Sequence, residues 1–306
     1  MANEKGYRPS TLDELSTQPK IQKMLRIYIQ AARIKHDTLD HVIITGPSGC
    51  GKSTTAYIIA NELGAKLKVY SGPAIKDQDD LTEILTGINQ GDVIFIDEIH
   101  RVNKKCQELL YFAMEQFEAD VNIDGCLQRI PLPHFTLIGA TNLYGGLNDA
   151  MLNRFPIQLK LAPYSNDAMS VIVSKAFNAL NVDITPSAAK LVAGCTRGVP
   201  RNANSYVRRI HDVALVMNDG KVDDEVVRTA FDLMDINEYG LNGDDMRYLR
   251  ILGRNAKAVG VDAIALMMNT DKATVETKIE PYLLQQGFIH KTPRGRVLSE
   301  KGREIL

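Results

Sequence analysis

Short apolar runs alternate with amphipathic stretches along the first half of the chain. Four runs predict strands, and they lie at 42–45, 66–70, 93–96 and 135–140. Apolar residues at helical spacing predict helices, which cover 21–32, 53–63, 81–88 and 103–116. Because strands that alternate with helices form parallel sheets, this half predicts a doubly wound α/β fold. A separate β-hairpin is expected over 119–132, with Asp124-Gly125 as its turn.

The second half of the chain has a different pattern. Helical spacing without strands predicts a small helical domain, with segments near 165–180, 186–195, 201–218 and 223–234. The rest predicts three helices and two strands, over 244–257, 261–268, 271–286, 288–291 and 296–298. Thr270 is the expected N-cap of the third helix, and Pro281 should kink it. Three helices and a hairpin describe a winged helix.

The turn after the first strand carries the clearest chemical motif. From Gly46 to Ser53 it reads G-P-S-G-C-G-K-S, the spacing of a phosphate-binding loop. Its glycines, Gly46, Gly49 and Gly51, let backbone N–H groups converge on phosphate oxygens. Lys52 would contact the β- and γ-phosphates of ATP, and Ser53 would offer a hydroxyl to Mg²⁺. The alternative is a glycine-rich turn without a ligand, and the flanking strand and helix argue against it.

Polar residues at the ends of two later strands complete a candidate hydrolytic site. Asp97 and Glu98 follow the strand at 93–96, so they fall at the same sheet edge as Lys52. Asp97 would hold Mg²⁺ through water, and Glu98 would polarise the attacking water. The alternative is a pair of exposed strand-end acids. Asn142 would orient the water or sense the γ-phosphate, unless it only begins a loop.

For two arginines the sequence pattern allows two roles each and does not choose between them. Arg154 follows a short helix at the rim of the sheet, where it is either a surface charge or an arginine finger that reaches a neighbour's nucleotide. Arg201 lies in the first turn of a helix that Pro200 begins. A cation there opposes the helix dipole, which suggests an anionic partner such as a phosphate, and a surface salt bridge is the alternative.

The hairpin near the end of the chain is basic. Lys291, Arg294 and Arg296 lie on or beside its turn, whereas the preceding helix carries Glu276 and Glu280. We therefore expect the hairpin, rather than the helix, to contact a DNA backbone without reading bases. A solvated turn is the alternative, because charged hairpin tips are common.

Composition narrows the class of protein further. The 306 residues include 36 Lys and Arg and 37 Asp and Glu, so any surface for nucleic acid must be local. The four cysteines form no C-x-x-C pair, which argues against a zinc site and fits reduced thiols. No exported or membrane-spanning segment is found, so a cytoplasmic protein without a membrane partner is expected. Cys50 lies in the phosphate loop and is expected to react with alkylating reagents.

Several segments together resemble a known family. They read Y-R-P-x-x-L-D-E-L, D-H-V-I-I-T-G-P-S-G-C-G-K-S-T, G-D-V-I-F-I-D-E-I-H-R-V-N, G-V-P-R-N-A-N and E-P-Y-L-L-Q-Q-G-F-I-H-K-T-P-R-G-R-V. These segments resemble the RuvB family of AAA+ motors, which drive Holliday-junction branch migration. The resemblance implies a large ATPase domain over 1–164, a small helical lid over 165–236 and a winged-helix head over 237–306. It also implies a homohexamer on duplex DNA at four-way junctions, with a RuvA-like partner.

The resemblance also assigns roles by position. Residues on the adenine side or in contact with the nucleotide are Tyr7, Arg8, Glu115, Gln116, Phe117 and Tyr164. Residues that hold phosphates and Mg²⁺ are Gly49, Gly51, Lys52, Ser53 and Thr54. Asp97 and Glu98 become the hydrolysis acids, Arg154 the finger and Arg201 the second sensor. In the head, the DNA-contacting positions are Lys272, Lys291 and Arg296.

Five departures from the family pattern stand out. Lys272 and Lys291 occupy positions where the family usually has Arg, which keeps the charge but loses bidentate phosphate contact. Asn142 replaces a Thr, and Leu152 replaces a basic residue. The hairpin at 119–132, the family's docking element for RuvA, is shorter than usual.

Two other functions fit parts of the same pattern. One is an AAA+ loader for a clamp or a helicase, which switches rather than moves along DNA. The other is a DNA-binding regulator that keeps an ATP-binding scaffold without hydrolysis. The presence of Lys52, Asp97, Glu98 and Arg154 argues against the second of these.

Overall fold

The structure is a computed structural model that describes residues 7–15, 18–123, 126–255 and 257–306. They form two compact units. The first holds the chain as far as Ala168 together with Val199–Arg201, and the second holds Met169–Gly198 and Asn202–Leu306. No helix in these described ranges is long and apolar enough to cross a membrane.

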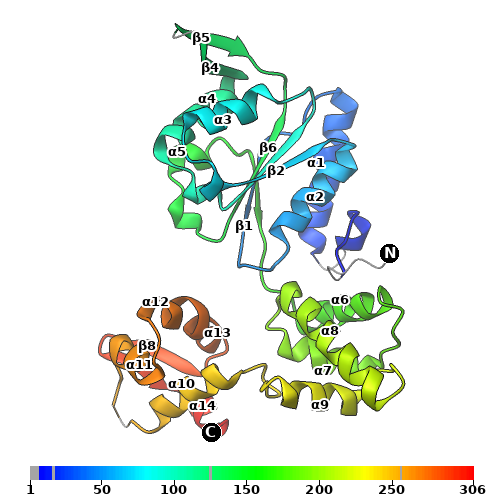
Figure 1. Ribbon diagram of the computed structural model, residues 1–306, viewed down its shortest axis with the longest axis vertical. Helices are drawn as coiled ribbons and strands as arrows, with labels where there is room; N and C mark the ends of the chain where they lie inside the picture. The colour runs from blue at the N-terminus through cyan, green and yellow to red at the C-terminus, as the bar shows by residue number, and fades with distance from the viewer. Residues whose placement is uncertain (1–6, 16–17, 124–125, 256) are drawn as a thin grey trace. The chain divides into compact units, whose positions relative to one another are not determined.

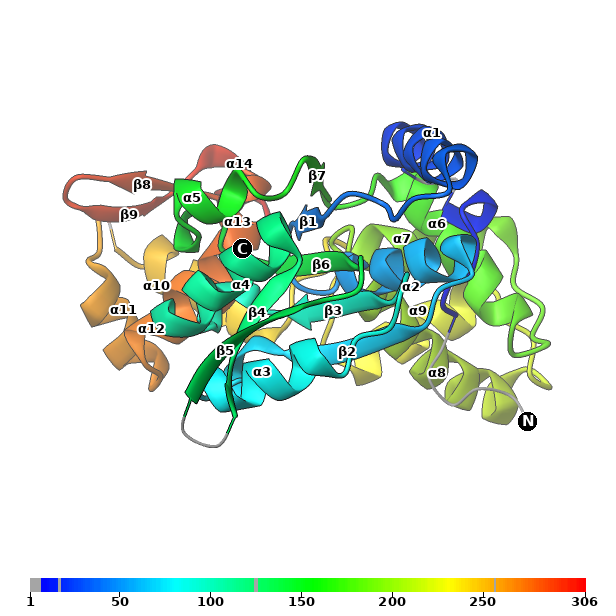
Figure 2. The same cartoon turned by 90° about the horizontal axis from the view of Figure 1, so that it is seen from above.

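A five-stranded parallel sheet is the centre of the first unit (Figure 1). In spatial order its strands are β2 (Leu67–Ser71), β3 (Val93–Asp97), β6 (Thr136–Thr141), β1 (Val42–Thr45) and β7 (Ile157–Lys160). Figure 2 shows β2, β3, β6 and β1 side by side. The predicted doubly wound sheet is confirmed. The edge strand β7 was not predicted, because only two of its four residues are buried.

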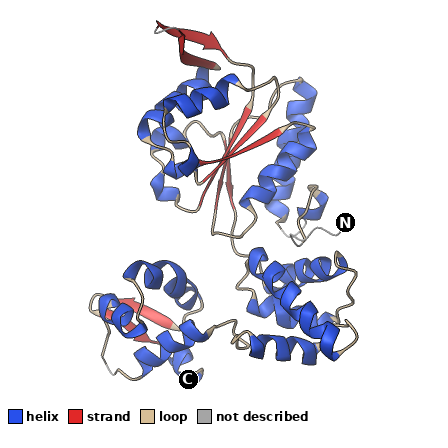
Figure 3. Ribbon diagram, in the orientation of Figure 1, coloured by secondary structure: helices blue, strands red, loops and turns tan. Residues whose placement is uncertain are grey.

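Helices cover both faces of this sheet (Figure 3). They are α1 (Pro19–Lys35), α2 (Lys52–Leu63), α3 (Gln78–Thr86), α4 (Lys104–Gln116) and α5 (Asp149–Leu152). Short 3₁₀ turns lie at Asp13–Leu15, Gly72–Ala74, Ile99–Arg101 and Tyr144–Gly146. Successive strand residues point to opposite faces, so Ile44 packs with α1 and α2 whereas Ile43 packs with α3 and α4. Each face therefore has its own apolar core.

The predicted hairpin is present beside α3 and α4, away from the central sheet (Figure 1). Its strands are β4 (Glu118–Ile123) and β5 (Cys126–Pro131). Across them the Arg129 Nε donates to Asp120 Oδ1 at 2.9 Å. The predicted turn, Asp124-Gly125, lies outside the described residues.

The second unit begins with the predicted helices. These are α6 (Asn166–Asn178), α7 (Pro186–Cys195), α8 (Pro200–Met217) and α9 (Asp224–Leu233), of which α6 and α8 start in the first unit. Their buried faces follow the helical spacing of the sequence, for example Val207, Ile210 and Ala214 on α8.

Residues 243–306 form the winged helix, which we call the head. Its elements are α10 (Gly243–Gly253), α11 (Val261–Met268), α12 (Lys272–Thr274), a π-helical turn (Val275–Ile279), α13 (Glu280–Gln285), β8 (Ile289–Thr292), β9 (Gly295–Leu298) and α14 (Glu300–Glu304). The short helix α14 was not predicted.

Two sequence predictions for the head were wrong in detail. The first helix ends at Gly253 rather than at Lys257, and Arg254 caps it by donating its N–H to Arg250 O. Thr270 is not the N-cap of the third helix. Asp271 is, because its carboxylate accepts the Thr274 N–H at 2.8 Å. The expected break near Pro281 is present as the π-helical turn that precedes α13.

An arginine connects the helical part of the second unit with the head. Arg197 donates from Nε to Gly240 O at 2.8 Å and forms an ion pair with Asp245. Its guanidinium also stacks over the Tyr282 ring, 4.5 Å from the centroid. Asp245 is 1% exposed and belongs to the capping box of α10, so this contact is almost fully shielded from solvent.

Candidate functional site

The loop between β1 and α2 needs glycine at three positions. Gly46, Gly49 and Gly51 have φ of 149°, 81° and 97°, a region that L side chains rarely adopt. A Cβ on Gly46 would lie 2.5 Å from Leu161 O, so the loop also passes too close to its neighbour for a side chain. Gly51 is the N-cap of α2 and points the start of that helix into the loop. This is the geometry of an anion site.

Lys52 lies at the start of α2 with its ammonium folded into the loop. Its Nζ donates to Gly46 O at 2.8 Å and Pro47 O at 3.0 Å. Burial lowers the pKa of Lys52, and the nearby Asp97 carboxylate partly offsets this. Ser53 and Thr54 follow in the first turn and are half-buried. The structure therefore gathers the predicted phosphate-binding residues in one loop.

Asp97 and Glu98 lie at the carboxyl end of β3, as expected. Asp97 Oδ1 accepts the Glu98 N–H at 3.0 Å, and Glu98 takes a left-handed conformation with φ of 51°. This turn directs the chain away from the sheet, and Glu98 Oε2 pairs with Arg101 at 3.1 Å. Both carboxylates are close enough to Lys52 to raise its pKa against the effect of burial. The two acids and the lysine thus share one edge.

Arg201 also reaches the phosphate loop, although it is far away in sequence. Its Nη1 donates to Ser48 Oγ at 3.0 Å, and its N–H donates to Gly49 O at 3.4 Å. A Cβ on Gly49 would lie 3.0 Å from the Arg201 Cβ, which explains glycine there. The Tyr164 hydroxyl also lies near the phosphate loop, because a Cβ on Gly51 would be 3.7 Å from it. Ser48 was missed by the sequence analysis, because its role depends on this long-range contact.

Arg8 lies against α2, and Tyr7 lies near the first 3₁₀ turn. The Arg8 guanidinium stacks over the Tyr57 ring of that helix, 5.3 Å from the centroid. Burial, and then the charge of Glu14, raise the pKa of Tyr7 to about 12. The structure thus holds Arg8 against α2 and Tyr7 near the first 3₁₀ turn of the first unit.

Arg154 is held by a different part of the unit. Its Nη2 pairs with Glu115 Oε2 at 3.1 Å, and its Nη1 donates to Ala150 O at 2.7 Å. Its guanidinium also stacks over the Tyr111 ring at 4.7 Å. Its Nε is buried and has no hydrogen-bond partner among the described residues. The contacts place Arg154 with α4 and α5, and none of them involves the phosphate loop.

The other predicted nucleotide residues are spread along the same rim. Gln116 is exposed at the end of α4, and Phe117 caps that helix with φ of 52°. The Phe117 ring stacks on His134 with the centroids 4.2 Å apart. Asn142 is exposed directly after β6. The structure places them at the surface of the unit and brings none of them into a described contact with Lys52.

Cys50 lies in an environment that argues against the reactivity expected from its place in the motif. Its side chain is fully buried in the core beneath the loop, and burial raises the pKa of its thiol despite Lys52 and Arg201. Cys106 and Cys195 are buried as well, whereas Cys126 is exposed. Burial of Cys50 therefore argues against the expectation that it reacts with alkylating reagents, because a thiolate must form and be reached.

This difference gives a direct prediction. In the folded chain we expect a thiol reagent such as iodoacetamide to modify Cys126 first, with the three buried cysteines reacting only when the protein unfolds. Mass spectrometry of tryptic peptides over time would measure this, and a Cys126→Ser variant should lose the fast phase. Early labelling of Cys50 would contradict the burial of its thiol.

The basic residues predicted in the head lie in different environments. Arg294 is exposed in the hairpin turn, and Lys272 is exposed and 3.4 Å from Asp262. Lys291 pairs with Glu280 at 2.9 Å. Arg296 is not at the tip, because the alternation of β9 points it inward, where it pairs with Glu280 at 2.7 Å. The structure therefore does not bring these four cations together.

The strand order, the phosphate loop, the paired acids and the arginine on the loop define an ATPase of the AAA+ class. Three family models match the chain in succession. They are the Holliday junction DNA helicase RuvB P-loop domain over 7–161, the RuvB AAA lid domain over 164–237 and the RuvB C-terminal winged helix domain over 238–306. The chain belongs to the RuvB family, and it is an ATP-hydrolysing enzyme of that family.

Individual relatives agree with these matches. The Holliday junction branch migration complex subunit RuvB of Chloroflexus aurantiacus is 42% identical over 309 residues, covering 99% of this chain and 88% of the relative. The subunit of the same name from Kosmotoga olearia is 42% identical over 305 residues, covering 98% and 89%. The structure of the Thermotoga maritima RuvB branch migration motor matches with a TM-score of 0.85, 37% identity and 97% coverage of both chains. A mutant of that protein gives a TM-score of 0.87 at 37% identity, with 98% coverage of both chains.

Proposed function

We propose that this chain forms a hexameric ring that hydrolyses ATP between subunits and moves duplex DNA through a four-way junction. The observation that carries the proposal is the phosphate loop with Lys52, Asp97, Glu98 and Arg201 around it. The relatives' name, branch migration complex subunit, supports the choice of DNA substrate. The proposed domains are the ATPase domain over 1–164, the lid over 165–236 and the head over 237–306.

The chain's own residues account for phosphate binding. Backbone N–H groups of the glycine loop would surround the phosphates, and Lys52 would exchange its two loop carbonyls for phosphate oxygens. Glu98 would hold the attacking water and accept its proton. Arg201 would contact the phosphates and couple their binding to α8, because it lies in the first turn of that helix.

Magnesium fits the same donor set. Among the described residues no group of three or more His, Cys, Asp or Glu could enclose a metal. The Ser53 hydroxyl and the Asp97 carboxylate offer oxygen ligands at the loop, and Mg²⁺ is usually held by few carboxylates together with substrate phosphates. When bound, Mg²⁺ would neutralise charge on the phosphates of ATP.

We place Arg154 in the neighbouring subunit's site. In its own subunit the described contacts of its side chain are with Glu115, Ala150 and Tyr111, and its Nε still has a proton to donate. This rim, with Gln116 close by, would face the adjoining subunit's ATP. A RuvA-like partner would dock on the β4–β5 hairpin.

Movement of a synthetic four-way junction tests the proposal. Purified protein with ATP and Mg²⁺ should convert the junction into two duplexes, alone or after addition of a RuvA-like protein, and sedimentation should show the ring on DNA. Release of phosphate without junction movement under both conditions would support a loader instead. A Lys52→Ala variant is the matched control that should do neither.

A further inference from the structure

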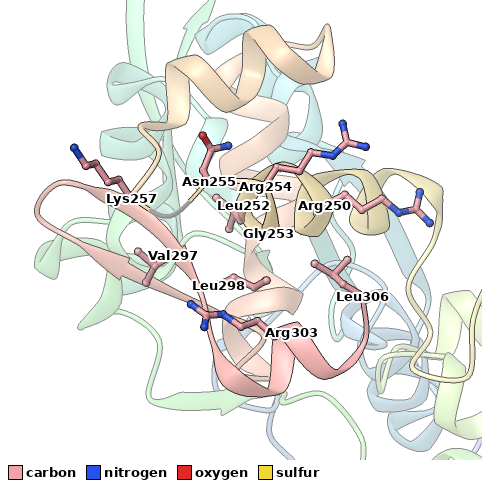
Figure 4. Close-up of a pocket in the computed structure, with 10 residues that line it drawn as sticks. All are labelled: Arg250, Leu252, Gly253, Arg254, Asn255, Lys257, Val297, Leu298, Arg303 and Leu306. Atoms are coloured by element: carbon pink, nitrogen blue, oxygen red, sulfur yellow. The ribbon is translucent and has the colours of Figure 1, made fainter.

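The head carries a concave site whose lining includes β9 but none of the hairpin-turn residues 292–295 (Figure 4). It has a volume of about 650 Å³ and lies between the end of α10, the segment after it, β9 and α14. Leu298 and Leu306 form part of its lining. Gly253 lets α10 approach them, since a Cβ there would lie 2.6 Å from Leu306 and 3.6 Å from Leu298.

Four cations line this site, and we call them the pocket cations: Arg250, Arg254, Lys257 and Arg303. All four are exposed, and no Asp or Glu lines the site with them. Within the described ranges none of the four has a carboxylate within 4.0 Å. Like charges brought together without an acid repel one another, so the arrangement favours an anionic ligand.

The end of α10 does not explain these charges. Cations near a helix C-terminus often donate hydrogen bonds to its last carbonyl groups. Here, however, Arg250 O accepts the Arg254 N–H, Leu252 O accepts the Asn255 N–H, and Ile251 O accepts from Asn255 Nδ2 at 2.7 Å. The helix end is therefore capped by backbone and amide groups, and the guanidinium groups remain available.

The hairpin differs in this respect. Lys291 and Arg296 share the Glu280 carboxylate, and Arg296 also pairs with Glu276 at 3.0 Å. Phosphate contact by Arg296 would have to compete with these acids, and its side chain is only 13% exposed. Among the described residues of the head, the pocket therefore gathers four cations without an ion pair, whereas Arg296 and Lys291 of the hairpin share an acid.

We propose that the pocket cations bind backbone phosphates of duplex DNA, as a second contact of the head besides its hairpin. This inference rests on the proposed function. Phosphate binding needs only cations at suitable spacing. A peptide added as a strand would need open backbone groups on β9, but at Arg296 both are already paired with Val259 at 2.8 and 3.0 Å. These observations favour nucleic acid over an acidic protein.

A charge-matched pair of variants tests the assignment. Arg254→Gln with Arg303→Gln removes two pocket cations, and Arg247→Gln with Lys278→Gln removes two exposed cations of the head that do not line the pocket. Fluorescence anisotropy with a labelled duplex at several salt concentrations gives the slope of log K against log salt. The pocket variant should bind more weakly, with a slope smaller by about 2, whereas the control variant should match the wild type.

A conservative variant guards against a purely structural effect. Arg254→Lys with Arg303→Lys keeps both charges and should keep the slope. Equal losses in the pocket and control variants, or no loss in either, would overturn the proposal. So would a pocket variant that binds the duplex normally but loses the wild type's binding of polyglutamate, because the pocket would then serve an acidic protein.

Junction movement and ATP turnover without DNA are measured on the same samples. If the wild type moves the junction and the pocket variant binds duplex normally, the pocket assignment fails while the proposed function stands. If the wild type neither binds duplex nor moves the junction, the proposed function fails and the pocket assignment fails with it.

Discussion

Replacing Arg154 by alanine is expected to lower ATP turnover by about 10³–10⁵-fold, the usual effect of removing an arginine finger. Binding of ATP should be retained, because none of the described contacts of Arg154 involves the phosphate loop. Steady-state phosphate release and titration with a fluorescent ATP analogue would measure the two quantities. Arg209→Ala on α8, which removes an exposed pair with Asp212, is the control and should leave both unchanged.

Mixing variants distinguishes action between subunits from action within one. A Lys52→Ala subunit keeps Arg154, and an Arg154→Ala subunit keeps its phosphate loop. Rings that contain both would include interfaces with one intact loop and one intact arginine, so the mixture should recover part of the turnover. Full turnover by Arg154→Ala alone, or a mixture as inactive as its components, would contradict the proposed role between subunits.

Replacing Glu280 by alanine is expected to destabilise the head by about 3–5 kcal/mol, the usual effect of breaking a buried ion pair. Glu280 is fully buried and accepts hydrogen bonds from Arg296 Nε at 2.7 Å and from the Tyr248 hydroxyl at 3.0 Å. Lys291 adds a third contact at 2.9 Å. Without the carboxylate the mostly buried Arg296 would keep only Glu276. Hydrogen exchange of residues 243–306 against urea would measure the loss.

Glu276→Ala is the matched control, since its side chain is 39% exposed and its pair with Arg296 should contribute about 1 kcal/mol or less. Equal effects of the two variants would show that Glu280 is not the centre of the network.

The dependence of stability on pH is a second test of the role of Glu280. Burial raises the pKa of Glu280, but bonds from Arg296, Lys291 and Tyr248 outweigh it and lower the pKa overall. The stability from Glu280 is therefore present above the ordinary pKa of glutamate, about 4.3, and lost as pH falls through the lower folded value.

The sequence predicted the centre of the sheet well because its three central strands are buried on both faces. β1, β3 and β6 read as continuous apolar runs, and the glycine spacing after β1 fixes the loop. β7 was missed because an edge strand of four residues, with only Ile157 and Leu159 buried, has too little signal. Thr270 and Asp271 are both good N-cap residues, so the pattern could not choose between neighbours.

Partners of charged side chains were much harder to predict. Lys52, Asp97 and Glu98 could be placed together because parallel strands end at one edge. The contact of Arg201 with Ser48 spans 153 residues, and no periodicity reports it. From the sequence, Arg296 is predicted to be a basic residue of the hairpin that contacts DNA. In the structure it bonds to Glu280, which lies 16 residues earlier on a helix. Burial of Cys50 was likewise invisible, because a loop motif does not reveal the core beneath it.

The arginine that connects the helical bundle of the second unit with the head has a mechanical consequence. To swing the head away from the bundle, Arg197 would have to leave Asp245, a carboxylate that is 1% exposed. Leaving a buried charge without its partner costs about 3–5 kcal/mol. The contacts of Arg197 with Gly240 and Tyr282 would break as well. Bundle and head should accordingly turn together as one rigid body, so that a small rotation at α8 becomes a larger displacement at the head surface that we propose binds DNA.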